Sequence, residues 1–280
     1  MRIKAIRVRT SYWRPGTDYV KEITSAISDI VQDGDIVVVS EKAIAVSSGL
    51  IIDESLIRAS SLARVIASLW MRKIWGGPLG RLAKLREKTK LRLKEFPLEA
   101  GAVHKQTAIR RVGFLQALRH YSEGGIDASN LPYSYVSLPL DEPSLVAERI
   151  WRSLESDTGR KLMVMIVDGD TTHSWRNLHL APRRVDVSGL IHFGGFLTFV
   201  LGRMLGLKER STPLAVSGAA LNPDLCLTFA NVAHRVRGYG AGRTVWDMAE
   251  RMGVDISRIT WEMLELVEHF PVVIIREIEG

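Results

Sequence analysis

The sequence of 280 residues has few features that would cross-link it covalently or anchor it in a membrane. Its one cysteine, Cys226, excludes an internal disulfide and a metal site built from several thiolates. No stretch approaches the ~18 consecutive apolar residues of a transmembrane helix. Residues 1–9 lack the apolar core of a signal peptide, and no low-complexity tract is present. We therefore expect a folded cytoplasmic protein with no membrane partner.

Basic residues outnumber acidic ones, with 38 Lys and Arg against 31 Asp and Glu, which gives a formal charge of +7. This excess permits binding of anions such as nucleotides, phosphorylated cofactors or nucleic acid, and it selects none of them. The most basic segment, residues 81–94, is either a solvated helix face or a funnel for a polyanionic ligand. No nucleic-acid-binding motif is present and aromatic residues do not interleave with the basic ones, so nucleic acid is not the expected partner.

The apolar pattern predicts strands and helices in irregular alternation. Short apolar runs predict strands, and apolar residues at helical spacing predict helices. We expect strands at residues 2–9, 36–39, 43–52, 162–167, 213–217 and 272–278. We expect helices at residues 20–31, 60–75, 144–156, 225–236, 245–252 and 261–269. Such an order favours an α+β fold with mixed sheets over repeated βαβ units.

Residues 196–205 are apolar on nearly every side. This pattern predicts a segment that is buried in the core or packed against a second subunit.

Two short acidic segments are the most informative part of the chain. Residues 124–130 read Gly-Gly-Ile-Asp-Ala-Ser-Asn, and residues 168–176 read Asp-Gly-Asp-Thr-Thr-His-Ser-Trp-Arg after the apolar run 162–167. Carboxylates and hydroxyls that follow a buried strand can bind Mg²⁺ or Mn²⁺ through hard oxygen ligands. The alternative is that both segments are plain turns, because Asp, Gly, Ser and Asn are common turn residues.

A glycine-rich segment, residues 238–242, reads Gly-Tyr-Gly-Ala-Gly. No strand precedes it, and neither a P-loop pattern nor a complete dinucleotide-binding fingerprint occurs in the chain. The pattern therefore favours a plain loop over a phosphate-binding loop.

The order of motifs resembles that of the coenzyme F-420:L-glutamate ligase family. Residues 15–18, Pro-Gly-Thr-Asp, match a Pro-Gly-Asp-Asp start, and residues 33–42 match an Asp-Gly-Asp strand that ends in Gln-Lys. Gly49 follows Lys42 by seven residues, as in the family. The most specific match is residues 125–130, against Gly-Val/Ile-Asp-x-Ser-Asn, and residues 166–176 resemble a strand that ends in Asp-Thr and closes on Trp-Arg.

The resemblance implies an α+β fold of two subdomains in a single unit over residues 1–280, and a homodimer. It also implies an amide (gamma-glutamyl) ligation in which GTP converts a terminal carboxylate of a deazaflavin coenzyme precursor into an acyl phosphate. The amine of L-glutamate then attacks this intermediate. The family requires Mg²⁺ or Mn²⁺ and is helped by K⁺. Such phosphoryl transfer depends mainly on positioning and on neutralising the phosphate charge.

Carrying the family motifs over position by position gives a set of expected site residues. The expected metal ligands are Asp127, Asp168, Asp170 and Thr171. The expected cofactor-binding residues are Lys42, Gly49, Ser129, Asn130 and Arg176. Among these, Lys42 could pair with a nucleotide phosphate as a point charge.

The chain also departs from the family pattern. The family's Asp-Thr-x-Gly-Arg-Pro-Trp-Arg is one residue shorter in residues 170–176, so the metal ligand is ambiguous between Asp168 and Asp170. Near the first strand, the family's Ser-Lys-Ala-Glu-Gly is replaced by Ala-Val-Ser-Ser-Gly at residues 45–49. The alternative is therefore a non-catalytic relative that binds a nucleotide or a partner. His173 could replace a ligand or base, or it could be a loop residue bonded to backbone.

Overall fold

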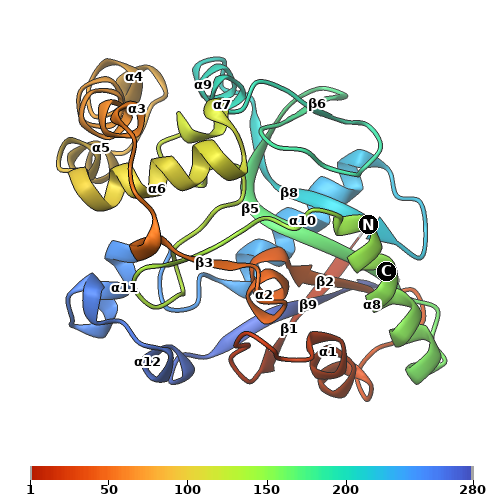
Figure 1. The fold of residues 1–280 in the computed structure, drawn as a ribbon. Coiled ribbons are helices and arrows are strands. Elements are labelled where there is room, and N and C mark those ends of the chain that lie inside the picture. The colour runs from red at the N-terminus through yellow and green to blue at the C-terminus, as the bar shows by residue number, and fades with distance from the viewer. Residues whose placement is uncertain (1, 279–280) are drawn as a thin grey trace.

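The computed structural model describes residues 2–278, and its architecture confirms the α+β prediction (Figure 1). The main sheet has seven strands in the order β1-β9-β2-β5-β6-β7, with β8 paired to β5, and a second sheet pairs β3 with β4. The strands are β1 (Arg2–Thr10), β2 (Ile36–Ser40), β3 (Ile51–Asp53), β4 (Tyr135–Ser137), β5 (Met163–Trp175), β6 (Leu178–Ala181), β7 (Leu190–His192), β8 (Lys208–Ser217) and β9 (His269–Ile278).

Helices cover the sheet and form a separate group beside it (Figure 1). The α-helices are α1 (Tyr19–Ile27), α2 (Glu41–Ser47), α3 (Ser61–Val65), α4 (Pro78–Leu82), α5 (Glu87–Lys94), α6 (Leu98–Arg111), α7 (Phe114–Ala117), α8 (Pro143–Thr158), α9 (Phe196–Met204), α10 (Pro223–Arg237), α11 (Val245–Met252) and α12 (Trp261–Glu265). A π-helix, η2 (Ile66–Trp75), continues α3, and two 3₁₀ turns lie at η1 (Glu54–Leu56) and η3 (Ile256–Arg258).

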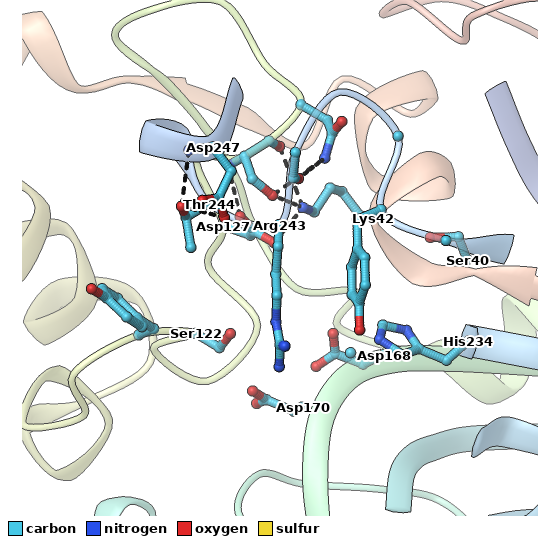
Figure 2. Close-up of a pocket in the computed structure, with 18 of the residues that line it drawn as sticks. Ser40, Lys42, Ser122, Asp127, Asp168, Asp170, His234, Arg243, Thr244 and Asp247 are labelled. Atoms are coloured by element: carbon cyan, nitrogen blue, oxygen red, sulfur yellow. Dashed lines mark hydrogen bonds and ion pairs between the residues drawn. The ribbon is translucent and has the colours of Figure 1, made fainter. Parts of the chain in front are cut away.

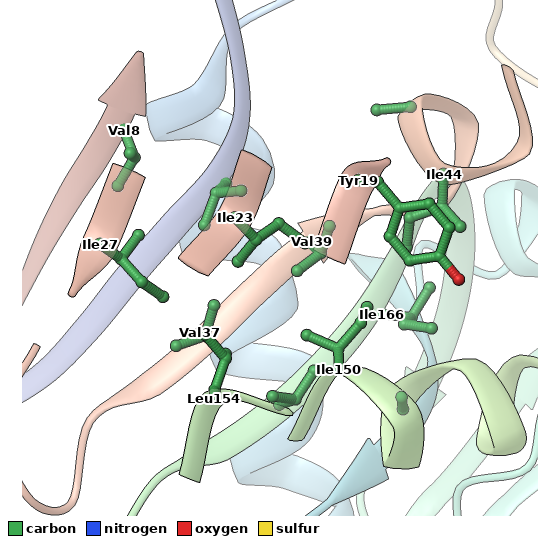
Figure 3. Packing of buried hydrophobic residues seen from close by; sticks show 14 of the residues in the cluster. Val8, Tyr19, Ile23, Ile27, Val37, Val39, Ile44, Ile150, Leu154 and Ile166 are labelled. Carbon is green, nitrogen blue, oxygen red and sulfur yellow. The ribbon is translucent and has the colours of Figure 1, made fainter. Parts of the chain in front are cut away.

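The centre of the main sheet is buried on both faces. β2 and β5 run parallel, while β9 and β8 pair antiparallel to them on the outer sides. Because side chains alternate along a strand, Val37 and Val39 pack with α1 and α8 on one face (Figure 3). Ile36 and Val38 pack with α10 on the other face. This double burial explains why β2 is a continuous apolar run.

A third hydrophobic cluster holds the helical group together. Met71 and Trp75 of η2 are fully buried and pack with Leu93 of α5 and Ala102 of α6. Val200 of α9 belongs to the same cluster and attaches the group to the distal end of β5, which α9 contacts. The prediction of two subdomains stays a prediction, because the described residues give several connected cores without a stated boundary.

The strand expected over residues 43–52, with a break near residues 47–49, is wrong before the break and present after it. Residues 41–47 form α2, which follows β2 directly, and only residues 51–53 extend as β3. Short apolar runs do not distinguish a strand from a buried helix. Here Ala43, Ile44 and Ala45 are all buried against the first cluster, so tertiary packing selects the helix.

The second acidic segment is also not a loop. β5 continues through it to Trp175, and its ladder with β8 shifts register between Asp168 and Thr171. The polar residues of this segment therefore belong to a strand with a β-bulge, which re-aims side chains locally.

Most other expected elements are present within a few residues of their predicted bounds. Asp18 caps α1 by accepting a hydrogen bond from the Lys21 amide at 3.2 Å. The predicted helix over residues 144–156 begins one residue earlier, with Pro143 in its first turn. Within residues 2–278, the helices lack the combined length and apolar character that a membrane crossing requires.

Candidate functional site

The two acidic segments and the glycine-rich segment line one cavity of about 650 Å³. Lys42 enters it from α2, Asp127 from the loop before β4, and Asp168 and Asp170 from the bulge of β5 (Figure 2). Residues 238–244, which follow α10, line it as well. Motifs that lie far apart in the sequence are therefore brought together at one cavity.

The bulge in β5 explains how two carboxylates reach the cavity. Asp168 pairs with Thr212 and Thr171 pairs with Ser211, so Gly169 and Asp170 are extra residues on β5. Gly169 passes close to α10, where a Cβ would lie 3.2 Å from Cε1 of His234. The close approach favours glycine at this position.

Asp170 forms a buried bidentate ion pair with Arg119. Arg119 Nη1 and Nη2 donate to the two carboxylate oxygens at 2.7 and 3.0 Å. Both residues are almost fully buried. Burial raises the pKa of Asp170 to about 6, against the opposing effect of Arg119.

Arg183 binds two carboxylates beside the cavity. It donates to Glu41 at 2.6 and 2.8 Å and to Asp168 at 2.9 Å. Burial, together with the neighbouring charge of Asp168, raises the pKa of Glu41 to about 7, although Arg183 opposes the shift. The first glycine of the matched motif makes room for this arginine, because a Cβ on Gly125 would lie 2.2 Å from Arg183 Nη1.

Lys42 joins two of the matched motifs. Its Nζ forms an ion pair with Asp127 and donates to Ser129 Oγ at 2.7 Å. Asp127 in turn accepts a hydrogen bond from the Ser129 amide at 2.7 Å. The ammonium group is thereby held at the cavity wall, where it could meet an anionic ligand.

Asn130 holds the glycine-rich segment in place. Its Oδ1 accepts from the Ala241 amide at 2.6 Å, and its Nδ2 donates to the Gly242 carbonyl at 3.1 Å. Gly240 has a φ of +57°, and a Cβ there would lie 2.6 Å from Asn130 Oδ1. The motif residue Asn130 thus positions a loop from the C-terminal third of the chain.

Several predicted residues lie elsewhere. Gly49 lies in the turn after α2 and Arg176 in the turn between β5 and β6, and neither lines the cavity. Arg176 instead places its guanidinium 5.4 Å from the Trp175 ring centroid. His173 is fully buried against Gly202 and Phe199, outside the cavity lining. It lies in β5, and neither ring nitrogen has a hydrogen-bond partner among the described residues. His173 is therefore neither a loop residue bonded to backbone nor a cavity residue.

The carboxylates as arranged do not fit a divalent cation. Asp127, Asp168 and Asp170 contact Lys42, Arg183 and Arg119, respectively. Within the described range, no group of three or more His, Cys, Asp or Glu side chains is close enough to hold a metal ion. Thr171 also lines the cavity, but its single hydroxyl group does not complete a set of metal ligands. This arrangement of side chains therefore supports no reaction step through a bound metal.

Part of the basic segment lies at the cavity. Arg86, Lys88 and Arg92 line it. Arg92 donates to Asp247 of α11 at 2.8 Å, and Lys88 donates to Glu250 at 3.3 Å. The basic segment is therefore more than a solvated helix face. Its position at the cavity is compatible with the other interpretation, a funnel for a polyanionic ligand.

Sequence reasoning missed the arginines of the site. Arg119, Arg183, Arg237 and Arg243 lie near the cavity or line it, but they belong to no motif. They come from segments that are adjacent only in the folded chain. A count of cations without acidic neighbours would have singled out residues 235–243, which contain three Arg and no Asp or Glu.

Comparison with known proteins gives a consistent picture. The sequence model of a family described as F420-0:Gamma-glutamyl ligase matches residues 7–213. A protein of Methanocaldococcus jannaschii, named "Uncharacterized protein MJ1361", is 30% identical over 286 aligned residues. The alignment covers 98% of this chain and 96% of that relative, so it includes the segment beyond residue 213.

Proposed function

The chain belongs to the F420-0:gamma-glutamyl ligase family, and from this premise we propose that it is a nucleotide-dependent ligase joining a carboxylate to an amine. The proposed nucleotide is GTP. The proposed substrates are a deazaflavin coenzyme precursor with a terminal carboxylate and L-glutamate. The observation that carries the proposal is the convergence of Lys42, residues 127–130 and residues 168–171 on one cavity with cationic residues in its wall.

The proposed reaction has two steps. A carboxylate oxygen of the precursor attacks the γ-phosphorus of GTP, a new O–P bond forms, and GDP leaves. The amine of glutamate then attacks the acyl carbon, phosphate leaves, and the amine loses a proton as the amide forms. In both steps negative charge develops on phosphate oxygens and on the leaving group. Fixed positive charge near these oxygens stabilises both transition states.

Residues of the cavity can be assigned to these needs. Lys42 is placed to neutralise a phosphate oxygen, and Asp127 and Ser129 keep its ammonium group in position. Asp168 is paired with Arg183, which holds its pKa below the usual range even though burial opposes the charge. An ionised carboxylate at this position would attract the ammonium group of an incoming amino acid.

Mg²⁺ or Mn²⁺, with K⁺ as a helper, stays part of the proposal through the family resemblance. Binding of such an ion would require Asp127, Asp168 or Asp170 to exchange an ion-pair partner for the metal. The ion would supply further positive charge to the phosphates. Calorimetric titration of GTP and of ATP, each with Mn²⁺ and with EDTA, tests whether nucleotide binding requires the metal ion.

The ligase assay tests the function itself. The protein is incubated with the deazaflavin precursor, GTP, Mn²⁺ and L-glutamate, and mass spectrometry follows addition of one glutamate residue and release of GDP. We expect the wild type to form the amide and Lys42→Met to lose activity by about 100-fold or more, as for a removed transition-state contact. An active Lys42→Met, or a wild type without amide product at any substrate concentration, would contradict the proposal.

A second function is favoured by the departures from the family pattern. The ion-paired carboxylates and the replaced residues at 45–49 suit a relative that binds a nucleotide or a partner without turnover. This alternative predicts GTP binding in the calorimeter with no release of GDP. The two functions are therefore separated by one pair of experiments.

A homodimer is also proposed, from the resemblance and from the surface around α9. Exposed apolar side chains on α9 and on the neighbouring β7 segment would lose contact with water in such a dimer. They are Ile191, Phe193, Leu197, Leu201, Met204 and Leu205.

A further inference from the structure

Two arginines of the C-terminal third, like the exposed Arg86, have no acidic partner among the described residues, whereas the other cations of the cavity do. Lys42, Arg92, Arg119 and Arg203 each form an ion pair with a carboxylate. Arg237, at the end of α10, and Arg243, after the glycine-rich segment, also line the cavity. Neither has an acidic partner within residues 2–278, although Arg243 lies 5.3 Å from the Tyr239 ring centroid.

Arg237 carries an unsatisfied donor. Its Nη2 donates to His234 Nδ1 at 3.2 Å, whereas its Nη1 is shielded from solvent and has no partner among the described residues. Burial, with a contribution from Arg237, lowers the pKa of His234 to about 4, so the imidazole is neutral at pH 7 and can accept this bond. A buried guanidinium N–H without an acceptor costs free energy, which a ligand oxygen would recover.

Arg243 is held at the cavity by its neighbours in the chain. Asn130 fixes the backbone of Ala241 and Gly242 just before it, and Thr244 caps α11 just after it. Figure 2 shows its side chain extending into the cavity in the direction of Asp168 and Asp170. Arg243 is exposed and positively charged. The backbone on both sides of it is held in place by the contacts of Asn130 and Thr244.

We propose that Arg237 and Arg243 form an oxyanion subsite that binds a phosphate or carboxylate group of the substrates. Guanidinium groups suit both ligands because their N–H donors match a pair of oxygens. The proposal rests on the ligase function for the identity of the ligands. It adds residues beyond the segment matched by the family model, which ends at residue 213. It also assigns a role to Asn130, which positions the segment that carries Arg243.

Calorimetry with two probes tests the subsite. Inorganic tripolyphosphate represents the nucleotide phosphates, and L-glutamate represents the carboxylate source. We expect Arg237→Gln and Arg243→Gln to weaken binding of one probe by about 10- to 100-fold, as for a lost charge-assisted hydrogen bond. The probe that is affected identifies which oxyanion the subsite binds.

Arg235→Gln is the matched control. Arg235 lies on α10 two residues before Arg237, is exposed, and does not line the cavity. The variant removes the same charge, so we expect binding within about twofold of wild type because only the overall field changes. Equal weakening in all three variants would indicate a general charge effect and overturn the proposal. The proposal would also be overturned if the wild type bound neither probe, or if both cavity variants bound the probes as tightly as the wild type.

Two further measurements keep the outcomes distinct. Arg243 is exposed, so Arg243→Gln carries the test if Arg237→Gln does not fold, and circular dichroism establishes which variants are folded. Probe binding that depends on both arginines, in a protein that forms no amide, would contradict the ligase function alone. Amide formation with unchanged KM for GTP and glutamate in both variants would contradict the subsite alone.

Discussion

Both halves of β5 contain buried side chains, but the two halves differ completely in chemistry. Residues 163–167 are apolar, and they lie between β2 and β8 in an unbroken ladder on the β2 side. After the bulge, Asp170, Thr172 and His173 are also buried, but their surroundings are arginine, threonine and aromatic side chains. The first half is stabilised by removing apolar surface from water. The second half depends on each buried charge keeping its partner.

This comparison shows where function enters the fold. The apolar half holds the strand in the sheet, and the bulge directly after it turns carboxylates toward the cavity. Burying polar and charged side chains costs free energy, so a strand that only stabilised the fold would be expected to carry apolar residues here. Four predictions test the contrast, in order of decreasing expected effect.

The largest effect is expected for Asp170→Ala. The substitution leaves Arg119 buried with both of its carboxylate bonds lost, which should lower the free energy of unfolding by about 4 kcal/mol. Urea unfolding followed by circular dichroism measures the change. Asp141→Ala, at an exposed aspartate, is the control and should be close to wild type. A variant of unchanged stability would show that Arg119 finds another partner.

The second effect concerns pH and Glu41. Its pKa is raised to about 7 in the folded protein from the ordinary 4.5. The folded state therefore binds the proton more tightly, so this contribution to stability is present below pH 4.5 and is lost as pH rises through about 7. The full contribution is about 3 kcal/mol. We expect wild type to lose stability between pH 5 and pH 8.

Glu41→Gln is the variant that isolates this effect. It removes the titrating group and should reduce the decline of the unfolding free energy between pH 6 and pH 8. Asp170, with a pKa raised to about 6, is half ionised at pH 6 and leaves a smaller residual slope in both proteins. Urea unfolding at pH 5, 6.5 and 8 gives the profile of each protein. Parallel profiles for wild type and Glu41→Gln would exclude Glu41 as the source.

The third effect is expected in the apolar half of the strand. Ile166 is fully buried and packs in the cluster that includes Ile150 and Val39 (Figure 3). Ile166→Val should lower the free energy of unfolding by about 1 kcal/mol through the lost methylene and a small cavity. Ile278→Val, at a half-exposed residue of β9, is the control. Catalysis should be unchanged in both, because the cavity lining stays intact.

The smallest effect on stability is expected at the surface near the distal end of β5. Leu201 and Leu205 are exposed on and just after α9, so Leu201→Glu with Leu205→Glu should leave unfolding nearly unchanged. In the proposed homodimer, the same pair should separate the subunits by burying two charges at the interface. Light scattering after gel filtration distinguishes a dimer from a monomer of 31.3 kDa.

Leu56→Glu is the control for oligomeric state, because Leu56 is exposed in η1, in another part of the fold. It should leave the mass as in wild type. A monomeric wild type would remove the basis for a homodimer in this protein.

Local patterns predicted the elements that depend on short-range order. The β-branched run of β2, the Asp18 cap of α1 and the periodic helix α10 all follow from neighbouring residues. Residues 41–47 could not be assigned in this way, because their apolar residues satisfy a strand and a buried helix equally. The length of β5 was missed for a related reason, since Asp, Gly and Ser favour turns when only neighbours are considered.

The candidate site was predicted in part. Lys42, Asp127, Ser129, Asn130, Asp168, Asp170 and Thr171 all line one cavity. Gly49 and Arg176, matched by the same reasoning, do not. A motif preserves the order of residues along the chain, but it does not state which of them contact a ligand and which support a turn.

The sequence by itself determined the family, the α+β class and the residues that carry the two acidic segments, because these depend on composition, periodicity and motif order. Only the tertiary structure decided the partners of the acids. Arg119, Arg183 and Lys42 reach the carboxylates from three separate segments, and Asn130 reaches a loop more than 100 residues later. Coulomb and hydrogen-bond energies depend on distance in space, which neighbouring residues in the sequence do not encode.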